Sequence, residues 1–302
     1  MKKTNSDRVL DVLNVAFMLL FTVIILYPLY FTVIASFSEP YDVAKGNVTF
    51  WIKGFTLEAY TNVFKNAQIW QGYLNSIIYT AVGTALNLAL TIPAAYVLSK
   101  KDLPGRTAIS WYFLFTMFFS GGLIPSYILI QKLGMLNRFS TLMILGAFGV
   151  YNMVIARVYF QTSIPGTLYE AAHIDGCGEF RAFFSIALPL AVPIIAVVAL
   201  FCAVAKWNDY FTGLIYLSSK KLYPLQLVLR SILILNESML KALDRQSGDA
   251  SGDARQAAMR MAYMAQAMKY SLIMISSLPM LVAYPFVQKY FVKGMMVGSL
   301  KG

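Results

Sequence analysis

Residues 170–176 read Glu-Ala-Ala-His-Ile-Asp-Gly, and after nine further residues positions 186–189 read Ile-Ala-Leu-Pro. Long apolar runs flank this polar, acidic stretch, so we expect it to lie in a loop outside a membrane. Gly176 breaks a short helix, because glycine allows positive φ or a close approach without a Cβ. Pro189 and Pro193 predict a kink at the start of the next apolar run, since proline removes a helical hydrogen bond. The segment therefore predicts a short helix, a turn and a second helix that enters the membrane at an angle.

The composition indicates a membrane protein. Hydrophobic residues make up 58% of the 302 residues and charged residues 13%, with a mean hydropathy of +0.62, whereas about a quarter of the residues in soluble domains are charged. Six apolar runs have the length of roughly 17–25 residues that crosses a bilayer, and backbone groups in lipid must be hydrogen-bonded internally. We therefore predict an all-α polytopic membrane protein with six transmembrane helices in one domain, residues 1–302. The predicted spans are Val12–Phe37, Tyr73–Ser99, Ala108–Ile130, Phe139–Tyr159, Ala182–Val204 and Tyr270–Phe291.

The third predicted span contains Gly121, Gly122 and Pro125, which interrupt its helical pattern. Its second half is therefore expected either to complete the crossing or to lie along the membrane interface.

Basic residues set the predicted orientation. The formal charge is +11, and many of the lysines and arginines fall on one side if the N-terminus is cytoplasmic, as the positive-inside rule expects. These residues are Lys2, Lys3, Arg8, Lys100, Lys101, Arg106, Arg157, Arg181, Lys289, Lys293 and Lys301. We therefore expect a multi-pass protein of the cytoplasmic membrane with both termini in the cytoplasm. This distribution also removes the case for a nucleic-acid partner.

The loop at about 160–181 is then cytoplasmic, and loops at about 38–72 and 205–269 face outward. The second outer loop contains a tandem Ser-Gly-Asp-Ala repeat at 247–254, which predicts a mobile tip between two helices. Two interpretations of this tip stay open: a tolerated surface insertion, or a contact for a partner protein.

Polar residues follow one face of the second predicted span. Ser76, Thr80, Thr84, Asn87 and Thr91 are three or four residues apart, which is helical spacing. Small hydroxyl residues commonly mediate packing between transmembrane helices. The alternative is a polar wall along an aqueous path, formed by Thr80, Thr84 and Asn87.

The sequence lacks the motifs of an enzyme or an energy-coupling site. It has no Gly-x-x-x-x-Gly-Lys-Ser/Thr phosphate loop, and its single histidine, His173, has no metal-ligand partner at a recognisable spacing. The interiors of the six predicted spans also lack Asp, Glu, Lys and Arg, which proton-driven carriers use as relays. If this chain transports a solute against its gradient, we therefore expect another protein to supply the energy.

The full spacing Glu-Ala-Ala, three residues, Gly, nine residues, Ile-x-Leu-Pro resembles the cytoplasmic loop of type I ABC importer permeases. Further segments resemble the smaller permease subunit of maltose-type carbohydrate importers, and residues 119–125 resemble a branch associated with complex or acidic oligosaccharides, such as those from alginate or pectin. The segments that carry the maltose-type resemblance are Ile124–Asn137, Trp207–Asp209 and Gly294–Gly302.

The resemblance implies a transport subunit that is not an enzyme. Its expected partners are a second permease subunit, two cytoplasmic ATPase subunits, an extracytoplasmic sugar-binding protein and an oligosaccharide substrate. It implies no cofactor or metal on this chain, with ATP and Mg on the ATPase. The residues implied to couple to the ATPase are Glu170, Ala171, Ala172, His173, Asp175 and Gly176, with Glu170 pairing with an arginine. The tail implied to reach the ATPase contains Met295, Gly298, Lys301 and Gly302.

Direct sugar contact is expected at Trp207, Asn208, Asp209 and Tyr210, because aromatic faces and amides suit sugars. The alternative is that these aromatic residues are ordinary membrane-interface anchors. Two other functions stay open: an ion-coupled secondary carrier without an ATPase, and a membrane scaffold or sensor that uses the loop to bind a cytoplasmic partner. The first predicts uptake that follows an ion gradient, and the second predicts no solute flux.

Overall fold

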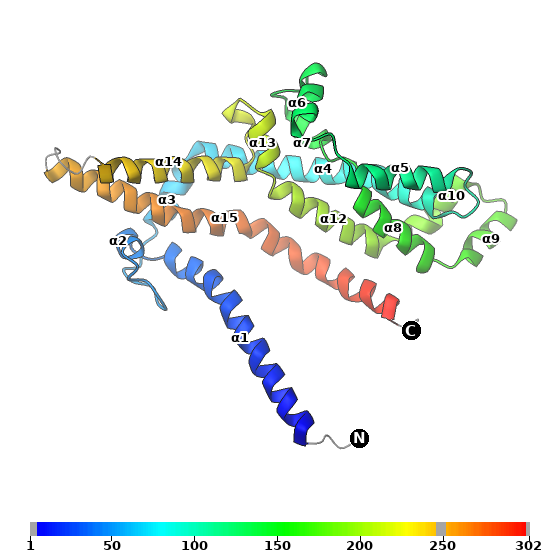
Figure 1. The fold of residues 1–302 in the computed structure, drawn as a ribbon, viewed down its shortest axis with the longest axis horizontal. Helices are drawn as coiled ribbons and strands as arrows, with labels where there is room; N and C mark the ends of the chain where they lie inside the picture. Colours follow the sequence, from blue (N-terminus) through cyan, green and yellow to red (C-terminus); the bar gives the residue numbers. More distant parts are fainter. Residues whose placement is uncertain (1–4, 246–251, 300–302) are drawn as a thin grey trace. The chain divides into compact units, whose positions relative to one another are not determined.

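The computed structural model describes residues 5–245 and 252–299, and those residues form helices joined by turns and loops (Figure 1). The all-α prediction is confirmed. The α-helices are α1 Asn5–Ser36, α2 Pro40–Ala44, α3 Glu58–Lys65, α4 Ala67–Ser99, α5 Arg106–Phe118, α6 Leu123–Lys132, α7 Phe139–Ile144, α8 Val150–Thr162, α9 Gly166–Ile174, α10 Glu179–Ala182, α11 Leu188–Leu190, α12 Val192–Trp207, α13 Phe211–Tyr216, α14 Leu225–Arg245 and α15 Gly252–Ser299. A π-helical turn occupies Phe183–Ala187, and a 3₁₀ turn occupies Lys220–Leu222.

Three helical segments are long and apolar enough to cross a membrane: Leu10–Ser36, Ala67–Ser99 and Met259–Pro285. Two further pairs of helices satisfy the same test together but are bent. The α5–α6 pair bends by 109°, and Glu179–Leu190 bends by 77° against α12. The count of six spans therefore stays a prediction.

The third and fourth predicted spans are interrupted. Helix α5 ends at Phe118 and α6 begins at Leu123, so the break falls where Gly121 and Gly122 predict it. The predicted fourth span, 139–159, is divided between α7 and the 13-residue α8, with residues 145–149 between them. That second break was not predicted, and it supplies part of the wall of the cavity described below.

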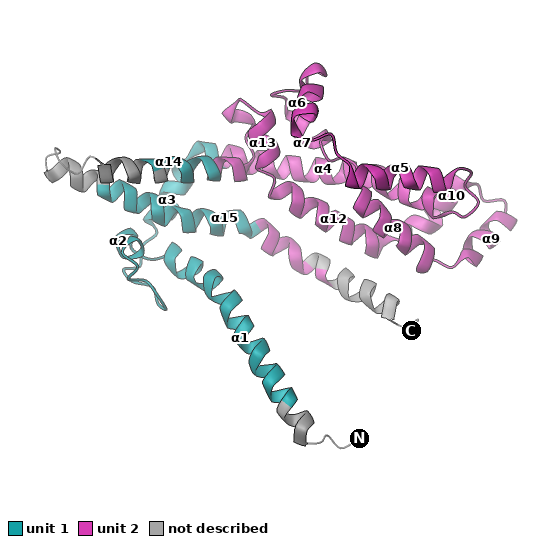
Figure 2. Ribbon diagram, viewed as in Figure 1, with its two compact units in different colours: residues 1–69, 229–278 teal, residues 70–228, 279–302 magenta. Residues whose placement is uncertain are grey.

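The chain divides into two compact units, which are coloured separately in Figure 2. The first comprises residues 1–69 and 229–278. Its small core joins the end of α1 to the loop that follows, with Ile34, Val43 and Val48 buried, and Phe31 meets Tyr270 edge-on at 5.6 Å between ring centroids. Earlier in α1 the apolar side chains are uncovered, for example Val23 at 63% exposure. Such an apolar helix surface suits lipid or another membrane helix.

The second unit comprises residues 70–228 and 279–302. Its core joins the C-terminal half of α4 to α8, the π-helical turn and α12, through buried Ile92, Met153, Phe160, Phe183 and Val198. Helix α9 lies at one end of this unit, and α13 lies toward the other (Figure 1). The two ends carry different candidate sites, and α4 connects them.

The predicted kink before α12 is confirmed. Pro189 and Pro193 lack backbone N–H groups, so the helical hydrogen-bond ladder is interrupted around Ala191. The ladder resumes where Ile195 N donates to Ala191 O at 2.9 Å. The bend of 77° allows the segment after the exposed loop to change direction as it becomes α12.

Candidate functional site: an exposed loop and a polar cavity

Helix α9 ends in a defined glycine cap. Gly176 has φ +74°, its N–H donates to His173 O at 3.0 Å, and Cys177 N donates to Ala172 O at 2.8 Å. This pair of hydrogen bonds, with a left-handed residue between them, is the Schellman arrangement that satisfies the last carbonyls of a helix. A Cβ at Gly176 would meet no atom within 4 Å. The positive φ, rather than a close approach, is therefore what favours glycine here.

The predicted coupling residues lie on and just after α9, and five of the six are exposed. Glu170, Ala171, His173, Asp175 and Gly176 face outward. Ala172 is only 8% exposed and packs against the chain itself. Of the two alanines in the motif, Ala171 is therefore the one available to a partner.

Two large apolar residues beside the helix cap are exposed, and they were not identified as candidate site residues from the sequence. Ile174 is 86% exposed and Phe180 is 85% exposed, one on each side of the turn at Gly176. Apolar side chains exposed within a polar loop are typical of an interaction site. Residue type alone could not have identified them, because Phe183, three residues after Phe180, is only 8% exposed.

A cluster of four residues, which we call the loop anchor, attaches α9 to its neighbours: Tyr96, Lys100, Tyr169 and Glu179. The Lys100 ammonium lies 3.6 Å from the Tyr169 ring centroid and 4.8 Å from that of Tyr96, within cation–π range. The Tyr96 hydroxyl donates to Glu179 Oε2 at 3.3 Å, and Lys100 Nζ lies 3.7 Å from the same oxygen.

The loop anchor joins three segments far apart in the sequence: the end of α4, α9 and α10. Outside the anchor, His173 Nε2 lies 3.1 Å from Glu179 Oε1, so it adds a contact between α9 and α10. No local sequence pattern reveals this cluster, because Tyr96 and Lys100 precede the loop by many residues. Helix α9 is therefore attached to the C-terminal end of α4 by direct side-chain contacts.

Tyr169 permits a sharp test of this attachment. Its hydroxyl is buried and has no hydrogen-bond partner within the described residues; burial and the charge of Glu179 raise the pKa of its phenol, which keeps it protonated at neutral pH. Tyr169→Phe is expected to change stability by less than about 0.5 kcal/mol or to stabilise, since an unpaired buried hydroxyl costs free energy. Tyr169→Ala is expected to cost about 2 kcal/mol or more by removing the ring from the anchor.

The measurement is thermal unfolding of the purified chain in detergent, with hydrogen exchange of the α9 amides as a local readout. Faster exchange in α9 for Tyr169→Ala but not Tyr169→Phe is the expected pattern. A large loss of stability in Tyr169→Phe would show that the hydroxyl has a partner.

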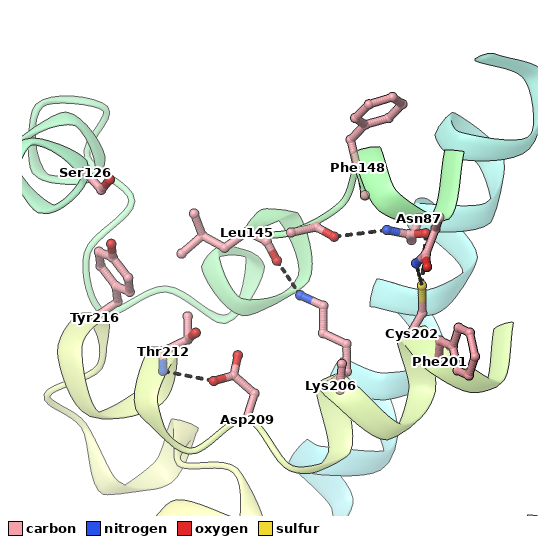
Figure 3. Close-up of a pocket in the computed structure, with 14 residues that line it drawn as sticks. Asn87, Ser126, Leu145, Phe148, Phe201, Cys202, Lys206, Asp209, Thr212 and Tyr216 are labelled. Atoms are coloured by element: carbon pink, nitrogen blue, oxygen red, sulfur yellow. Dashed lines mark hydrogen bonds between the residues drawn. The ribbon is translucent and has the colours of Figure 1, made fainter. Parts of the chain in front are cut away.

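Nine residues before Tyr96 along α4, at Asn87, a cavity of about 520 Å³ lies within the second unit (Figure 3). Its wall is assembled from α4, α6, the 145–149 segment, α8, α12 and α13. Polar side chains on this wall are Asn87, Ser126, Asn152, Lys206, Asp209 and Thr212. Phe148 and Phe201 supply aromatic surface. The volume falls in the range of about 300–1,000 Å³ typical of small-molecule sites.

Of the seven predicted path residues, the structure brings Asn87 and Asp209 to this cavity. The hydroxyls of Thr80 and Thr84 are buried without a hydrogen-bond partner in the described chain, and neither residue lines the cavity. Trp207 is 3% exposed and packs edge-on against Tyr73 at 5.6 Å. Asn208 and Tyr210 are exposed; the Asn208 amide donates to Val204 O at 2.9 Å.

Two residues on the polar face of α4, Ser76 and Asn87, have different surroundings. Ser76 Oγ accepts the backbone N–H of Leu225 at 2.8 Å, which is helix packing. Asn87 donates to Gly146 O at 3.2 Å and accepts from the Cys202 thiol at 3.0 Å, and it also lines the cavity. Packing therefore dominates near Ser76, and the cavity begins near Asn87.

Lys206 was also missed by the sequence analysis. The predicted fifth span ended at Val204, but α12 continues to Trp207 and carries Lys206 into the wall. Lys206 lies in the last turn of α12, so the prediction that the interiors of the spans lack charged residues is not contradicted by it. Lys206 Nζ donates to Leu142 O at 2.8 Å and also to Leu145 O, at the C-terminal end of α7.

Gly83 makes room for the lysine. A Cβ at Gly83 would lie 3.1 Å from Lys206 Cε and 3.3 Å from its Cδ, closer than ordinary contact. The aliphatic stem of Lys206 therefore crosses α4 at a position where glycine is favoured. Within residues 5–245 and 252–299, no group of three or more His, Cys, Asp or Glu side chains is placed to hold a metal ion.

The last predicted contact, the tail, lies largely outside the described residues. Lys301 and Gly302 follow the described part of α15, and nothing is described of the side chain of Met295. Gly298 belongs to the last turn of α15. The repeat at 247–254 also falls mainly outside, since the description stops at 245 and resumes at 252.

Comparison with known proteins gives consistent relatives, although no family model matches the chain. The protein LplC of Bacillus subtilis strain 168 is 39% identical over 100% of this chain and 98% of its own length. The polygalacturonan/rhamnogalacturonan transport system permease protein YtcP of the same organism is 36% identical over 98% of this chain and 100% of its own. A solved structure of a bacterial ABC transporter involved in the import of the acidic polysaccharide alginate contains a chain with a TM-score of 0.84 and 29% identity, covering 96% of this chain and 99% of that one.

Proposed function

The chain belongs to the maltose-type family of carbohydrate-import ABC transporter permeases, and from this premise we propose that it carries an oligosaccharide through the cavity beside Asn87. It is a membrane transport subunit and not an enzyme, and an ATPase and a binding protein are its partners. The proposal adds the composition of the complex: a second, different permease chain, two ATPase subunits and one extracytoplasmic binding protein. ATP and Mg bind to the ATPase, and both termini of this chain lie in the cytoplasm.

The exposed helix α9, held from behind by the loop anchor, is the observation that carries the proposal. Glu170, Ala171 and Ile174 are exposed, while Tyr169 is held by Lys100 and Tyr96. A helix with an outward surface and a rigid attachment can transmit force from a partner. We propose that α9 seats in a groove of the ATPase, with Glu170 pairing with an arginine and the chain's tail reaching the same partner.

Helix α4 provides the connection from this loop to the cavity. Tyr96 of the loop anchor and Asn87 of the cavity lie nine residues apart on one continuous helix, which is roughly 14 Å at 1.5 Å per residue. Closure of the ATPase dimer would move α9, and α4 would move with it. The cavity would then open alternately to the two sides of the membrane as helices move as rigid bodies.

The relatives whose names state a substrate name sugars, and they differ on which sugar. Their names and descriptions include polygalacturonan/rhamnogalacturonan, diacetylchitobiose, melibiose/raffinose/stachyose and alginate. This range supports an oligosaccharide for the present chain, without choosing among them. The aromatic and amide groups of the cavity suit the CH faces and hydroxyls of sugars in general.

The test is transport by the assembled complex in proteoliposomes. The four kinds of subunit are reconstituted, and accumulation of labelled maltotriose, trigalacturonate and trimannuronate is followed with and without ATP. We expect ATP-dependent accumulation of at least one sugar, and none when the phosphate-loop lysine of the ATPase is replaced. Accumulation driven by a proton or sodium gradient without ATP would favour a secondary carrier, and the absence of any flux would favour a scaffold.

A further inference from the structure

Lys206 places a fixed cation in the wall of the cavity, and its surroundings compensate it only in part. Its two described hydrogen bonds go to the neutral carbonyl oxygens of Leu142 and Leu145. An ammonium group has three N–H donors, so one remains without a partner among the described residues. Backbone carbonyls stabilise an ammonium group but do not neutralise its charge, and an uncompensated charge away from water is costly.

The carboxylate nearest in sequence is engaged elsewhere. Asp209 also lines the cavity, but its Oδ1 accepts the backbone N–H of Thr212 at 3.0 Å, at the start of α13 (Figure 3). Within the described chain, Lys206 forms no ion pair. The cavity wall therefore carries a cation that forms no ion pair within the described residues, and an acid that acts on this cation electrostatically while it accepts the backbone N–H at the start of α13.

Neighbouring residues fix the position of the Lys206 side chain. Gly83 leaves the space through which the lysine stem passes, and the C-terminal carbonyls of α7 fix the ammonium at the cavity wall. A lysine at the rim of a membrane helix ordinarily extends toward water; this one turns inward across α4. An inward cation in a sugar-sized cavity has a natural complement in a sugar that carries a carboxylate.

We propose that Lys206 binds the carboxylate of a uronate residue, so that this permease selects acidic oligosaccharides as they cross the membrane. The inference rests on the proposed function, since it assumes that the cavity is part of the sugar path. The third N–H of Lys206 donates to a carboxylate oxygen of the sugar, and charge-assisted hydrogen bonds of this kind are stronger than neutral ones. Phe148 and Phe201 provide apolar surface for the sugar ring.

The experiment compares two probes that differ in charge. Trigalacturonate and its methyl ester have the same length and ring hydroxyls, but the ester carries no carboxylate. Equilibrium binding of each is measured on the permease–ATPase complex in nanodiscs without the binding protein, so that the selectivity of that protein does not enter. The chain is tested as wild type, Lys206→Arg and Lys206→Met, with Lys132→Met as the control, because Lys132 is an exposed lysine at the end of α6 away from the cavity.

We expect wild type to bind the acid at least about 10-fold more tightly than the ester. Lys206→Met should lose at least about 30-fold in affinity for the acid, in line with removing one partner of a buried charge pair, and should bind the ester as wild type does. Lys206→Arg should keep most of the preference for the acid, and Lys132→Met should keep all of it.

Three results would overturn the inference. In the first, Lys206→Met loses affinity equally for the acid and the ester, which would show that Lys206 only supports the end of α7. In the second, wild type binds both probes with equal affinity, which would show that the cavity does not distinguish a charged from an uncharged sugar. The second result needs no variant, so it decides the question even if Lys206→Met does not assemble. If ATP drives uptake of maltotriose while trigalacturonate is neither bound nor moved, the proposed function stands and this inference fails. If ATP drives uptake of no sugar, the proposed function itself fails.

Discussion

Replacing Glu170 by lysine is expected to reduce sugar uptake at least about 30-fold and to release the ATPase from the purified complex. Glu170 is exposed on α9 and forms no ion pair or hydrogen bond through its side chain within the described residues. Its removal should therefore leave insertion and stability of this chain unchanged. Reversing its charge would place a lysine against the arginine proposed on the ATPase, and losing a hydrogen-bonded charge pair at an interface costs about 2–5 kcal/mol.

The measurement is the amount of ATPase retained by the affinity-tagged permease, together with uptake in cells. Glu58→Lys is the matched control, because Glu58 is an exposed carboxylate at the start of α3 and lies in a loop predicted to face outward. Normal ATPase retention and normal uptake in Glu170→Lys would remove Glu170 from the coupling interface. Restored retention when the arginine on the ATPase is changed to glutamate would identify the pair directly.

Much of the cytoplasmic loop could be predicted from the sequence because its signals are local. Gly176 occupies the left-handed position of a helix cap, and Pro189 and Pro193 interrupt the following helix, as the order of residues alone indicates. Such effects depend on backbone chemistry within a few residues. The helical class followed from composition and from the need to satisfy backbone groups in lipid.

The loop anchor and the cavity could not be predicted in this way, because they depend on distant segments. Lys100 stacks on Tyr169 and Glu179 accepts from Tyr96, which are contacts across three helices. Lys206 was counted outside the membrane helices because a hydropathy run ends at the first charged residue, whereas the helix continues past it. Trp207 shows the converse: interfacial composition suggested a sugar or lipid contact, but tertiary packing buried it against Tyr73.

Removing the two apolar side chains beside Gly176 is expected to disrupt ATPase binding more strongly than any other change in the loop. Ile174 and Phe180 are 86% and 85% exposed in this chain. Docking of a partner would therefore remove nearly the whole surface of both side chains from water. Burying a large apolar side chain contributes about 1.5–3 kcal/mol, and two such residues would contribute a factor of 100 or more to affinity by this order-of-magnitude estimate. The double substitution Ile174→Ser with Phe180→Ser should therefore leave little ATPase bound.

The same substitution should not destabilise the permease, since neither side chain is covered by its own chain. Retention of the ATPase and thermal unfolding of the isolated permease are measured on the same preparations, with Trp51→Ser as the control, because Trp51 is 77% exposed in the loop predicted to face outward. Full retention of the ATPase by the double variant would mean that the partner binds elsewhere than at the turn. A lower unfolding temperature with reduced retention would instead assign the two residues to the fold of the loop. Loss of retention at unchanged stability is the combination that places them in the interface, because only a surface completed by a second protein loses affinity without losing stability.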